Sequence, residues 1–518
     1  MTATASIRDP LASLRAAVAG EALIDDPVEG DFYAQDVYSK GPQPLAVFRP
    51  GNIAELSAGL AAAAAAALII VPRGGGMSYT SGYVADTPGA LIVDLGRMTR
   101  ILAVDPVDMT VTVEAGCSWA ALHAALAPRG LRTPVWGTLS GGKASIGGGV
   151  SQNGAFWGAG AGSIAASVLS LDVVLVNGRV VTTGAGFFRP HGPDVTGLFA
   201  GDGGAFSIKA HVTLPLVRTP VAAAFGSFAF DTAAAAFAAI SEIARNGLAS
   251  ECFGFDPFLQ SQRLRRASLG SDVRTLASVV KAEGSIWQGL RAGTRLIAAG
   301  RDFIGETAFS VHLIVEGRSQ PRADEDLAAV RAIALANGGR EIENSIPKVL
   351  RAAPFPPVNS MLGPDGERWV PVHGIVRHSQ AAAAMAAVVA LFAANRSALD
   401  ELGVGVGTMF LPVGRNGFLL EPVFFWPDAS EEIHRRSVEA AHLARLRRHP
   451  ANPAARALVD RLRLAIIALF AEHDAVHFQT GRAYPLRDRI DPAAWQLLGA
   501  VKTAVDRDGR MNPGVLGL

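Results

Sequence analysis

Three side chains able to handle protons or anions lie within eight residues near the C-terminus, namely His477, Arg482 and Tyr484. Histidine titrates near neutral pH, as a general base must, and arginine can hold a carboxylate or phenolate through two hydrogen bonds. We therefore predict a catalytic group with His477 as base, Arg482 as electrostatic partner and Tyr484 as hydrogen-bond donor to a substrate oxygen. The alternative is an ordinary strand whose polar side chains are satisfied by their neighbours.

Two glycine-rich stretches could bind an anion. The first, residues 71–82, reads V-P-R-G-G-G-M-S-Y-T-S-G and follows a helix-forming alanine run that passes into the short apolar strand 68–70. Consecutive glycines after a strand can take positive φ and direct their N–H groups toward one point. A lone stretch of this kind could be only a tight turn, but a second one follows at residues 137–149 after a strand and a helix.

Neither stretch matches the common nucleotide-binding motifs. The dinucleotide fingerprint needs G-x-G-x-x-G between a strand and a helix, with an acidic residue about 20 positions later. The phosphate-binding G-x-x-x-x-G-K-[ST] motif is excluded because Lys143 is followed by Ala144. The pair therefore indicates a different mode of binding an extended diphosphate.

The composition indicates a folded protein with more than one domain. The chain has 518 residues, which is too long for a single hydrophobic core of ordinary size. Of these residues, 49% are apolar. A net charge of +1 argues against nucleic acid or an anionic membrane as the main partner. Two cysteines, Cys117 and Cys252, cannot build a disulfide framework and favour a reducing cytoplasm.

No segment predicts export or membrane insertion. Residues 60–71 are apolar, but about 12 residues fall short of the ~20 that cross a bilayer. Residues 1–10 have neither the basic nor the apolar region of a signal peptide. We therefore expect a cytoplasmic protein that uses no membrane and no nucleic acid.

Strands and helices alternate in the N-terminal half and must position the glycine stretches. We expect helices over 11–25, 52–67 (with Asn52 as N-cap) and 119–126, strands over 44–50, 90–95 and 109–116, and a hairpin over 167–181. The hairpin is expected to turn at Asn177-Gly178 with type I′ geometry. After residues 218–220 the pattern changes to alanine-rich helices (232–245, 381–399) and strands such as 309–315, with a long loop over 351–368.

The order of these motifs resembles the superfamily of flavoproteins that includes vanillyl-alcohol oxidase and p-cresol methylhydroxylase. The resemblance rests on both glycine stretches, V-E-A-G at 113–116 before a helix, the segment 193–208, and D-x-x-G with Asn512-Pro-Gly at the end of the chain. Asn-Pro-Gly alone could be an ordinary turn. The resemblance implies an α+β fold. Residues 1–219 and 476–518 would form a two-lobed FAD-binding domain of the p-cresol methylhydroxylase (PCMH) type. Residues 220–475 would form an inserted α+β cap domain that provides the substrate pocket.

FAD is the cofactor that this resemblance implies. The expected contacts come from both glycine stretches, the segment before residue 208 and the C-terminal segment: Pro72, Arg73, Gly74, Gly75, Gly76, Met77, Ser78, Ser140, Ser145, Ile146, Gly148, Gly149, Ser151, Asn153, Ile208 and Asn512. Gly203 stands where the family often has an acidic residue. Met77 stands where the family can carry its flavin-linking histidine, so we expect non-covalent FAD.

The resemblance further implies an enzyme that takes a hydride from a hydroxyl-bearing or benzylic carbon of a small alcohol or aromatic compound. Phe478 and Gln479 replace the Tyr-Arg pair of phenol-oxidising members and are expected in the substrate pocket. Residues 158–161 lack the acid of those members. His373 and His378 do not complete the family's metal motif, so we expect no metal.

Two alternatives to this activity remain. One is a D-2-hydroxy-acid dehydrogenase of the same superfamily, in which Arg482 would grip the substrate carboxylate. The other is a non-catalytic, flavin-binding redox protein. Oxygen or another acceptor would reoxidise the flavin, and the protein could be a monomer or a homodimer.

Overall fold

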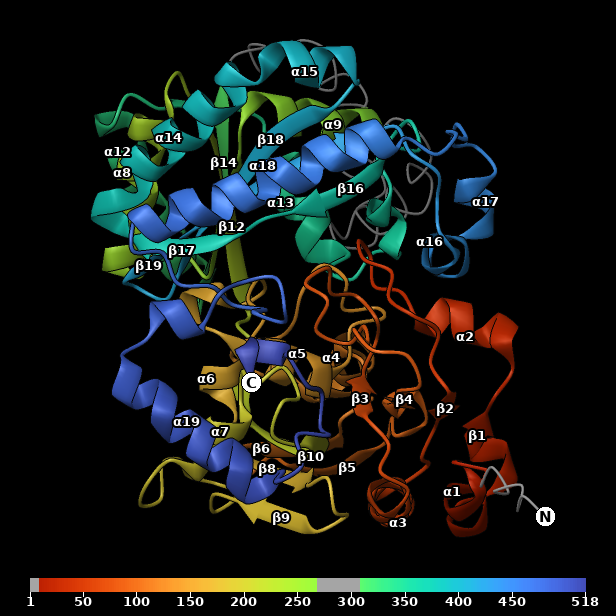
Figure 1. Cartoon of the computed structure of the whole chain (residues 1–518). Helices are drawn as coiled ribbons and strands as arrows, with labels where there is room; N and C mark the ends of the chain where they lie inside the picture. The colour runs from red at the N-terminus through yellow and green to blue at the C-terminus, as the bar shows by residue number, and fades with distance from the viewer. Residues whose placement is uncertain (1–8, 268–307) are drawn as a thin grey trace, which may run out of the picture.

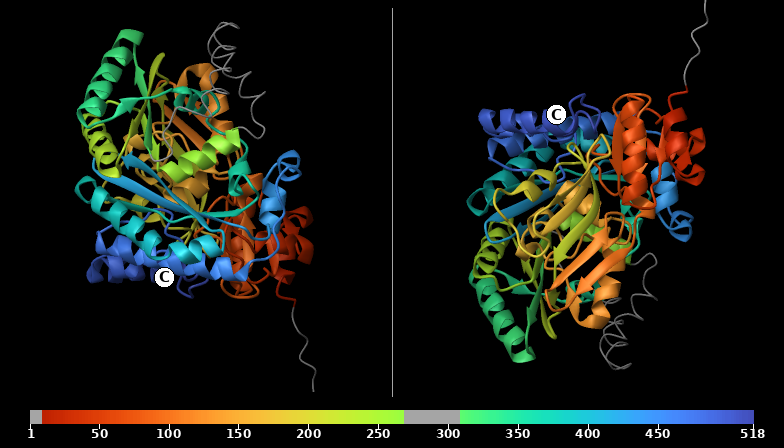
Figure 2. Two further views of the ribbon diagram at one scale, coloured as in Figure 1. Left: turned by 90° about the horizontal axis from the view of Figure 1, so that it is seen from above. Right: turned by 90° about the horizontal axis from the view of Figure 1, so that it is seen from below.

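The computed structural model describes residues 9–267 and 308–518. Figure 1 shows two lobes, with a large sheet and its helices in one and the smaller sheets in the other. This mixture of separate helices and strands confirms the expected α+β class. Figure 2 shows the N-terminal helices, in red, at the opposite edge of the molecule from helix α12 (Gln320–Ala336), in green.

A four-stranded sheet carries the first glycine stretch. Its order is β1 (Leu23–Ile24), β2 (Ala46–Phe48), β4 (Leu91–Asp94) and β3 (Ile70–Arg73). Helix α3 (Ile53–Ala65) joins β2 to β3, and the side chain of Asn52 caps it by accepting the Glu55 amide, as expected. The helix predicted over 11–25 is shorter in the structure, where α1 spans only Ala12–Ala17. A 3₁₀ turn and strand β1 follow it, because this part of the chain pairs with β2.

A five-stranded antiparallel sheet packs against the helix that ends the second glycine stretch. Its order is β5 (Ile101–Asp105), β6 (Thr110–Glu114), β10 (Ile208–Pro215), β8 (Ser170–Val174) and β9 (Val180–Thr183). Helix α4 (Trp119–Leu126) has the predicted bounds, and the short helix α5 (Ile146–Gln152) contains the end of the stretch. The β8–β9 hairpin has a longer loop than predicted, because only Gly178 takes positive φ and Leu175 bonds to Arg179.

The other lobe is built on a sheet of eight strands. The path runs β15-β12-β14-β13-β18-β19-β16, and β17 also pairs with β19. The strands are β12 (Ala222–Phe230), β13 (Glu251–Phe255), β14 (Phe309–Gly317), β15 (Arg340–Glu341), β16 (Arg368–Pro371), β17 (Gly374–Arg377), β18 (Gly405–Val413) and β19 (Gly417–Trp426).

Helices cover one face of this sheet, including α8 (Ala233–Asn246), α12, α14 (Ala381–Ala394) and α18 (Pro453–Glu472). The predicted helix over 381–399 is interrupted at Asn395, after which α15 (Arg396–Glu401) begins. The expected loop 351–368 starts inside α13 (Ser345–Ala352) and contains a 3₁₀ turn at Val358–Met361.

The end of the chain returns to the smaller sheets. After helix α19 (Pro492–Val505), Met511 forms a parallel bridge to Ile70 beside β3. The domain limits at 219/220 and 475/476 stay a prediction.

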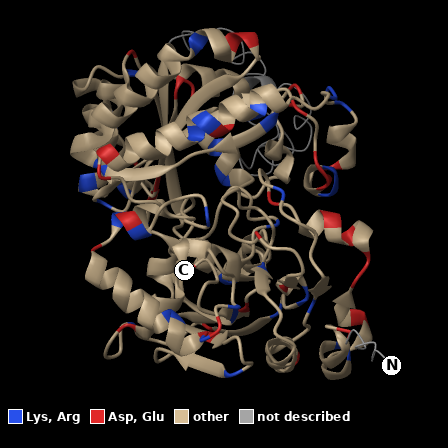
Figure 3. Cartoon of the chain, in the orientation of Figure 1, with Lys and Arg blue, Asp and Glu red and all other residues tan. Residues whose placement is uncertain are grey.

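Charged residues are interspersed over both lobes in Figure 3, in keeping with the net charge of +1. Within residues 9–267 and 308–518, no helix combines the length and the apolar composition needed to span a bilayer.

Candidate functional site

A cavity of about 260 Å³ extends between the glycine stretches and the eight-stranded sheet. One water occupies ~30 Å³ in the liquid, so this space suits a ligand rather than isolated waters. Residues 72–79 and most residues between 138 and 156 line one part of the cavity, and residues of α9 (Pro257–Ala267), β16, β18 and β19 line another. The two glycine stretches touch directly, because a Cβ atom at Gly74 would lie 2.4 Å from Ser145 Oγ.

The first stretch presents free backbone amides to this cavity. Within the described residues, the N–H groups of Gly74, Gly75, Gly76 and Met77 have no hydrogen-bond acceptor. Successive unpaired amides of this kind form a concave anion site. A Cβ atom at Gly75 would lie 1.9 Å from the Lys143 carbonyl oxygen, so only glycine allows the two stretches to approach this closely. These features fit the diphosphate of FAD.

The second stretch is held by its own hydrogen bonds. Ser145 caps α5 by accepting the Gly148 amide at 3.2 Å, and Gly147 donates to the Ala115 carbonyl. A Cβ atom at Gly147 would lie 2.5 Å from Cβ of Ala115. The V-E-A-G segment thus packs against α5, and residues 147–149 of this helix line the cavity.

Most of the predicted FAD contacts line the cavity. They are Pro72, Arg73, Gly74, Gly75, Gly76, Met77, Ser78, Ser140, Ser145, Gly148, Gly149, Ser151 and Ile208. Ile146, Asn153 and Asn512 lie outside this lining and support it instead. Ile146 is fully buried in the core, and the side chain of Asn153 accepts the Ala165 amide.

Asn512 connects three segments around the cavity. Its side-chain nitrogen donates to the carbonyls of Gly82 at 2.8 Å and Gly203 at 2.9 Å. Both glycines line the cavity. The expected proximity of Asn512 to the cofactor site is therefore indirect, through the backbone that it holds.

The remaining wall of the cavity comes mainly from β18 and β19. Alternate residues of β19 face the cavity: Leu419, Glu421, Val423 and Phe425. Glu421 lies opposite Met409 of β18, and both line the cavity. Among the described lining residues, Glu421 is the single carboxylate, and it stands in a largely apolar wall completed by Trp369.

Tyr79 connects the first glycine stretch to this wall. Its ring packs edge-on against Trp369 with centroids 5.6 Å apart, and its hydroxyl accepts a long hydrogen bond from the Gln479 amide at 3.4 Å. Burial raises the pKa of Tyr79 well above its ordinary value. Phe478 and Gln479 both line the cavity, and their place in the substrate pocket stays a prediction.

Arg482 lies outside the described cavity lining, in contrast to its expected catalytic role. Its guanidinium donates to the carbonyls of Ser81 at 2.5 Å, Val84 at 2.8 Å and Pro513 at 2.6 Å, and to the side chain of Asn512 at 3.0 Å. These bonds direct the guanidinium mainly toward backbone carbonyl groups. The geometry therefore favours a structural role for Arg482 over binding of a substrate carboxylate.

Tyr484 and His477 also lie outside that lining. The Tyr484 hydroxyl accepts the His373 amide at 3.0 Å, and His477 donates through Nδ1 to the His373 carbonyl at 2.7 Å. The two rings stack with centroids 4.2 Å apart. Burial lowers the pKa of His477, although its bond to the carbonyl opposes the shift. Residues 477–484 form turns rather than a strand, with Gln479 and Gly481 at positive φ, so alternation does not order the side chains.

A carboxylate from the large sheet contacts the segment 158–161, which has no acid of its own. Both oxygens of Glu251 accept the Gly158 amide, at 2.8 and 3.0 Å, and one accepts Trp136 Nε1 at 3.2 Å. Burial raises the pKa of Glu251 to about 8. Glu251 is outside the cavity lining, so it joins the lobes rather than facing a ligand.

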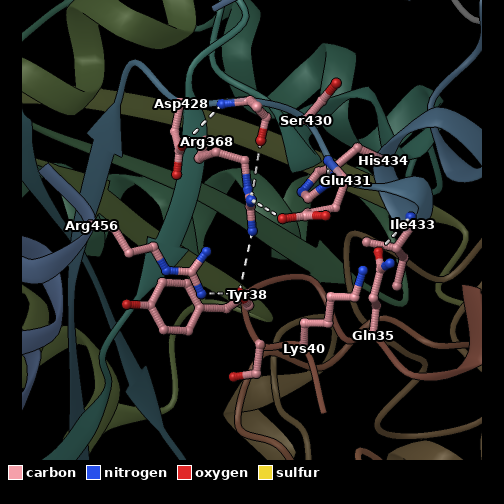
Figure 4. A network of polar contacts seen from close by, with 12 residues as sticks. Gln35, Tyr38, Lys40, Arg368, Asp428, Ser430, Glu431, Ile433, His434 and Arg456 are labelled. Atoms are coloured by element: carbon pink, nitrogen blue, oxygen red, sulfur yellow. Dashed lines mark hydrogen bonds and ion pairs between the residues drawn. The ribbon is translucent and has the colours of Figure 1, made fainter. Parts of the chain in front are cut away.

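A second contact between the lobes surrounds Arg368 (Figure 4). Its guanidinium is buried and donates to the carbonyls of Val37 and Tyr38 at 3.4 and 3.3 Å. Arg456 donates to the same Tyr38 carbonyl at 2.5 Å and lies over the Tyr38 ring. Gln35 accepts the Ile433 amide at 3.1 Å. Because Val37 lines the cavity, this contact ties the cavity wall to the large sheet.

Sequence comparison identifies the glycine-rich half of the molecule. Residues 44–184 match the family described as FAD binding domain. D-2-hydroxyglutarate dehydrogenase of Xanthomonas citri pv. viticola is 32% identical over 223 residues, 41% of this chain and 45% of that protein. Glycolate oxidase subunit GlcD of Bacillus subtilis is 32% identical over 189 residues, 35% of this chain and 40% of that protein. The chain thus spans less than half the length of these relatives.

Structural comparison extends the similarity to nearly the whole chain. A structure of p-cresol methylhydroxylase with substrate bound superposes with a TM-score of 0.69 at 15% identity, covering 98% of this chain and 96% of that one. Alkyldihydroxyacetonephosphate synthase gives 0.68 at 15% identity, covering 97% and 84%. Residues 44–184 thus match an FAD-binding domain, the chain as a whole shares the fold of p-cresol methylhydroxylase, and FAD is the cofactor that these matches support.

Proposed function

We propose that the protein is an FAD-dependent oxidoreductase that removes a hydride from a hydroxyl-bearing carbon of a small organic substrate. The observation that carries this proposal is one cavity that joins the free amides of residues 74–77 to a wall bearing Glu421. The names of the relatives, a D-2-hydroxyglutarate dehydrogenase and a glycolate oxidase subunit, support oxidation of a hydroxyl compound.

Bound FAD supplies the hydride acceptor, and the protein's own residues bind and orient the substrate. Glu421 is the proposed general base for the substrate hydroxyl, because it is the carboxylate of the described lining. Met409, Phe425 and Trp369 around it exclude water, which strengthens the interaction between the carboxylate and the hydroxyl.

The relatives also favour a 2-hydroxy acid as substrate. In this chain Arg482 cannot supply the carboxylate contact, because its hydrogen bonds go to backbone and to Asn512. Arg73 and Lys209 are the cationic side chains of the described lining, and both belong to the FAD-binding half. A small neutral alcohol therefore stays our first proposal.

Anaerobic reduction of the bound flavin tests the proposal. The holoprotein is mixed with a panel of glycolate, D-lactate, D-2-hydroxyglutarate and benzylic or aliphatic alcohols, and flavin absorbance is followed. At least one member is expected to bleach the flavin, and admitting air then shows whether oxygen reoxidises it. A flavin that no hydroxyl compound bleaches would favour a non-catalytic redox protein.

Glu421→Gln is expected to slow flavin reduction by ~10²-fold or more, the usual contribution of a positioned base, with FAD content unchanged. Glu251→Gln is the matched control, because this carboxylate is buried but outside the cavity lining. Reduction of Glu421→Gln at the wild-type rate would contradict the assigned role.

A further inference from the structure

Helix α9 brings a glutamine with an unpartnered acceptor to the cavity. Gln262 lines the cavity and is 7% exposed. Within the part of the chain that the structure describes, its side-chain oxygen Oε1 is buried and accepts no hydrogen bond. Leu259 lies three residues earlier, on the same face of the helix, and also lines the cavity. Gln262 therefore belongs to the face of α9 that borders the cavity.

Two glycines of β18 let α9 lie close to the large sheet. A Cβ atom at Gly405 would lie 2.4 Å from the ring of Phe258, and a Cβ atom at Gly407 would lie 2.9 Å from the same ring. Residues 405, 407 and 409 share one face of β18 by alternation, and Met409 lines the cavity. Helix α9 thus packs on the face of the sheet that borders the cavity.

Glu421 projects from that same face of the sheet. Strands β18 and β19 are antiparallel, and Glu421 is paired in register with Met409. Directly paired residues point to the same side of a sheet, and both of these line the cavity. One wall of the cavity therefore carries two polar side chains from different elements, Gln262 from α9 and Glu421 from β19.

We propose that Gln262 determines substrate specificity by accepting a hydrogen bond from a second hydroxyl group of the substrate, while Glu421 binds the hydroxyl that is oxidised. The inference rests on the proposed function and narrows the substrate class to uncharged diols. An amide oxygen only accepts hydrogen bonds, so an ionised substrate carboxylate, which also only accepts, cannot satisfy Oε1. A substrate ammonium group would bring a charge to a largely apolar wall, where its burial is costly.

Anaerobic flavin reduction of the wild-type holoprotein gives the first test. Each alcohol is compared with its diol at equal, subsaturating concentration: 1-butanol with 1,3- and 1,4-butanediol, and 1-pentanol with 1,5-pentanediol. At least one diol is expected to reduce the flavin about tenfold or more faster than its alcohol, because the alcohol leaves a buried acceptor unsatisfied.

Equal rates for every pair would overturn the inference, and so would reduction by a hydroxy acid but by none of the diols. Both outcomes leave the proposed function standing. A flavin that no hydroxyl compound reduces would instead overturn the proposed function and this inference with it.

Gln262→Met gives the second test, because it keeps the length of the side chain and removes the acceptor. It is expected to bring the ratio of diol to alcohol rates to within about twofold of one, with FAD content unchanged. Glu421→Gln is expected to slow both substrates, so the two roles are separable. A diol preference that survives in Gln262→Met would overturn the inference. The comparison of substrates on wild type needs no variant, so it decides the question even if Gln262→Met does not fold.

The matched control is Gln260→Met on the same helix. Gln260 is also buried, but it lies outside the cavity lining and its Oε1 accepts the Ser310 hydroxyl at 2.9 Å. This variant is expected to keep the wild-type preference for diols. Loss of the preference in both glutamine variants would show that packing of α9, and not the Gln262 acceptor, sets specificity, and would overturn the inference.

Discussion

At the scale of single residues, the guanidinium of Arg482 holds three parts of the chain together. Arg482→Ala is expected to lower the free energy of unfolding by about 3 kcal/mol, because several buried carbonyls lose a charged donor. FAD content should fall with it, since Ser81 and Asn512 adjoin cavity-lining backbone. Urea unfolding and the flavin-to-protein absorbance ratio measure both effects.

The control for this change is Arg377→Ala. Arg377 is 69% exposed and makes a single ion pair with Asp474 at 3.4 Å, so its loss is expected to cost less than about 1 kcal/mol. Should Arg482→Ala keep wild-type stability and FAD content but lose flavin reduction, the catalytic role expected from the sequence would be correct.

Gly75→Ala is expected to abolish tight FAD binding. The added Cβ atom would lie 1.9 Å from the Lys143 carbonyl oxygen, and backbone on both sides must then separate. The flavin content of the purified variant measures this directly. Gly499→Ala in α19 is the control, because nothing lies within 4 Å of its new Cβ atom and a helical alanine stabilises. Full flavin content in Gly75→Ala would contradict the close approach described here.

Candidate cofactor contacts could be named from the sequence residue by residue, whereas the residues of the opposite cavity wall could not. Consecutive glycines allow positive φ and can turn their amides toward one point, which is a local property, so residues 74–76 point to an anion site without knowledge of the fold. Glu421 gives a weaker local signal, a single acid in the apolar strand 418–426. Its importance depends on which face of β19 meets the cavity, and strand pairing decides that.

At the scale of elements, the predictions succeeded where the determining contacts are short in sequence. Helices α3 and α4 have N-caps three residues from the amides they bond, and their bounds were close to those expected. The segment 477–484 was misjudged because its shape depends on distant backbone. Arg482, for example, bonds its amide to the Thr80 carbonyl.

The contact of Glu251 in β13 with Trp136 and Gly158 should make the free energy of unfolding depend on pH. The folded pKa of Glu251, about 8, exceeds its ordinary value of 4.5, so the folded state binds this proton more tightly than the unfolded state. The site's contribution to stability is therefore fully present below about pH 4.5 and is lost as pH rises toward about 8.

Glu251→Gln keeps a neutral side chain at every pH and is expected to flatten the decline in unfolding free energy between about pH 5 and pH 8. Chemical denaturation at several pH values measures the slope. Glu325→Gln, at a site 71% exposed, should retain the wild-type slope. An unchanged slope in Glu251→Gln would show that other groups set the pH dependence.

At the scale of the whole molecule, no described residue of the cavity lining is a histidine or cysteine. The segment 268–307 contains no histidine, cysteine or tyrosine in its sequence. We predict that FAD is bound without a covalent link, with Met77 in the position where the family can carry its flavin-linking histidine. Acid precipitation is expected to give a colourless pellet and a yellow supernatant, whereas a yellow pellet would show a covalent bond.

The smaller sheets are closed by a segment that lies far from them in sequence. Asn512 bonds the Gly82 carbonyl across 430 residues of sequence, and Met511 pairs with Ile70. During synthesis, the large sheet has all its strands once β19 has emerged, whereas the FAD half still lacks its closing segment. The FAD half is therefore closed by contacts between residues more than 400 positions apart, whereas the strands of the large sheet need no residue beyond β19.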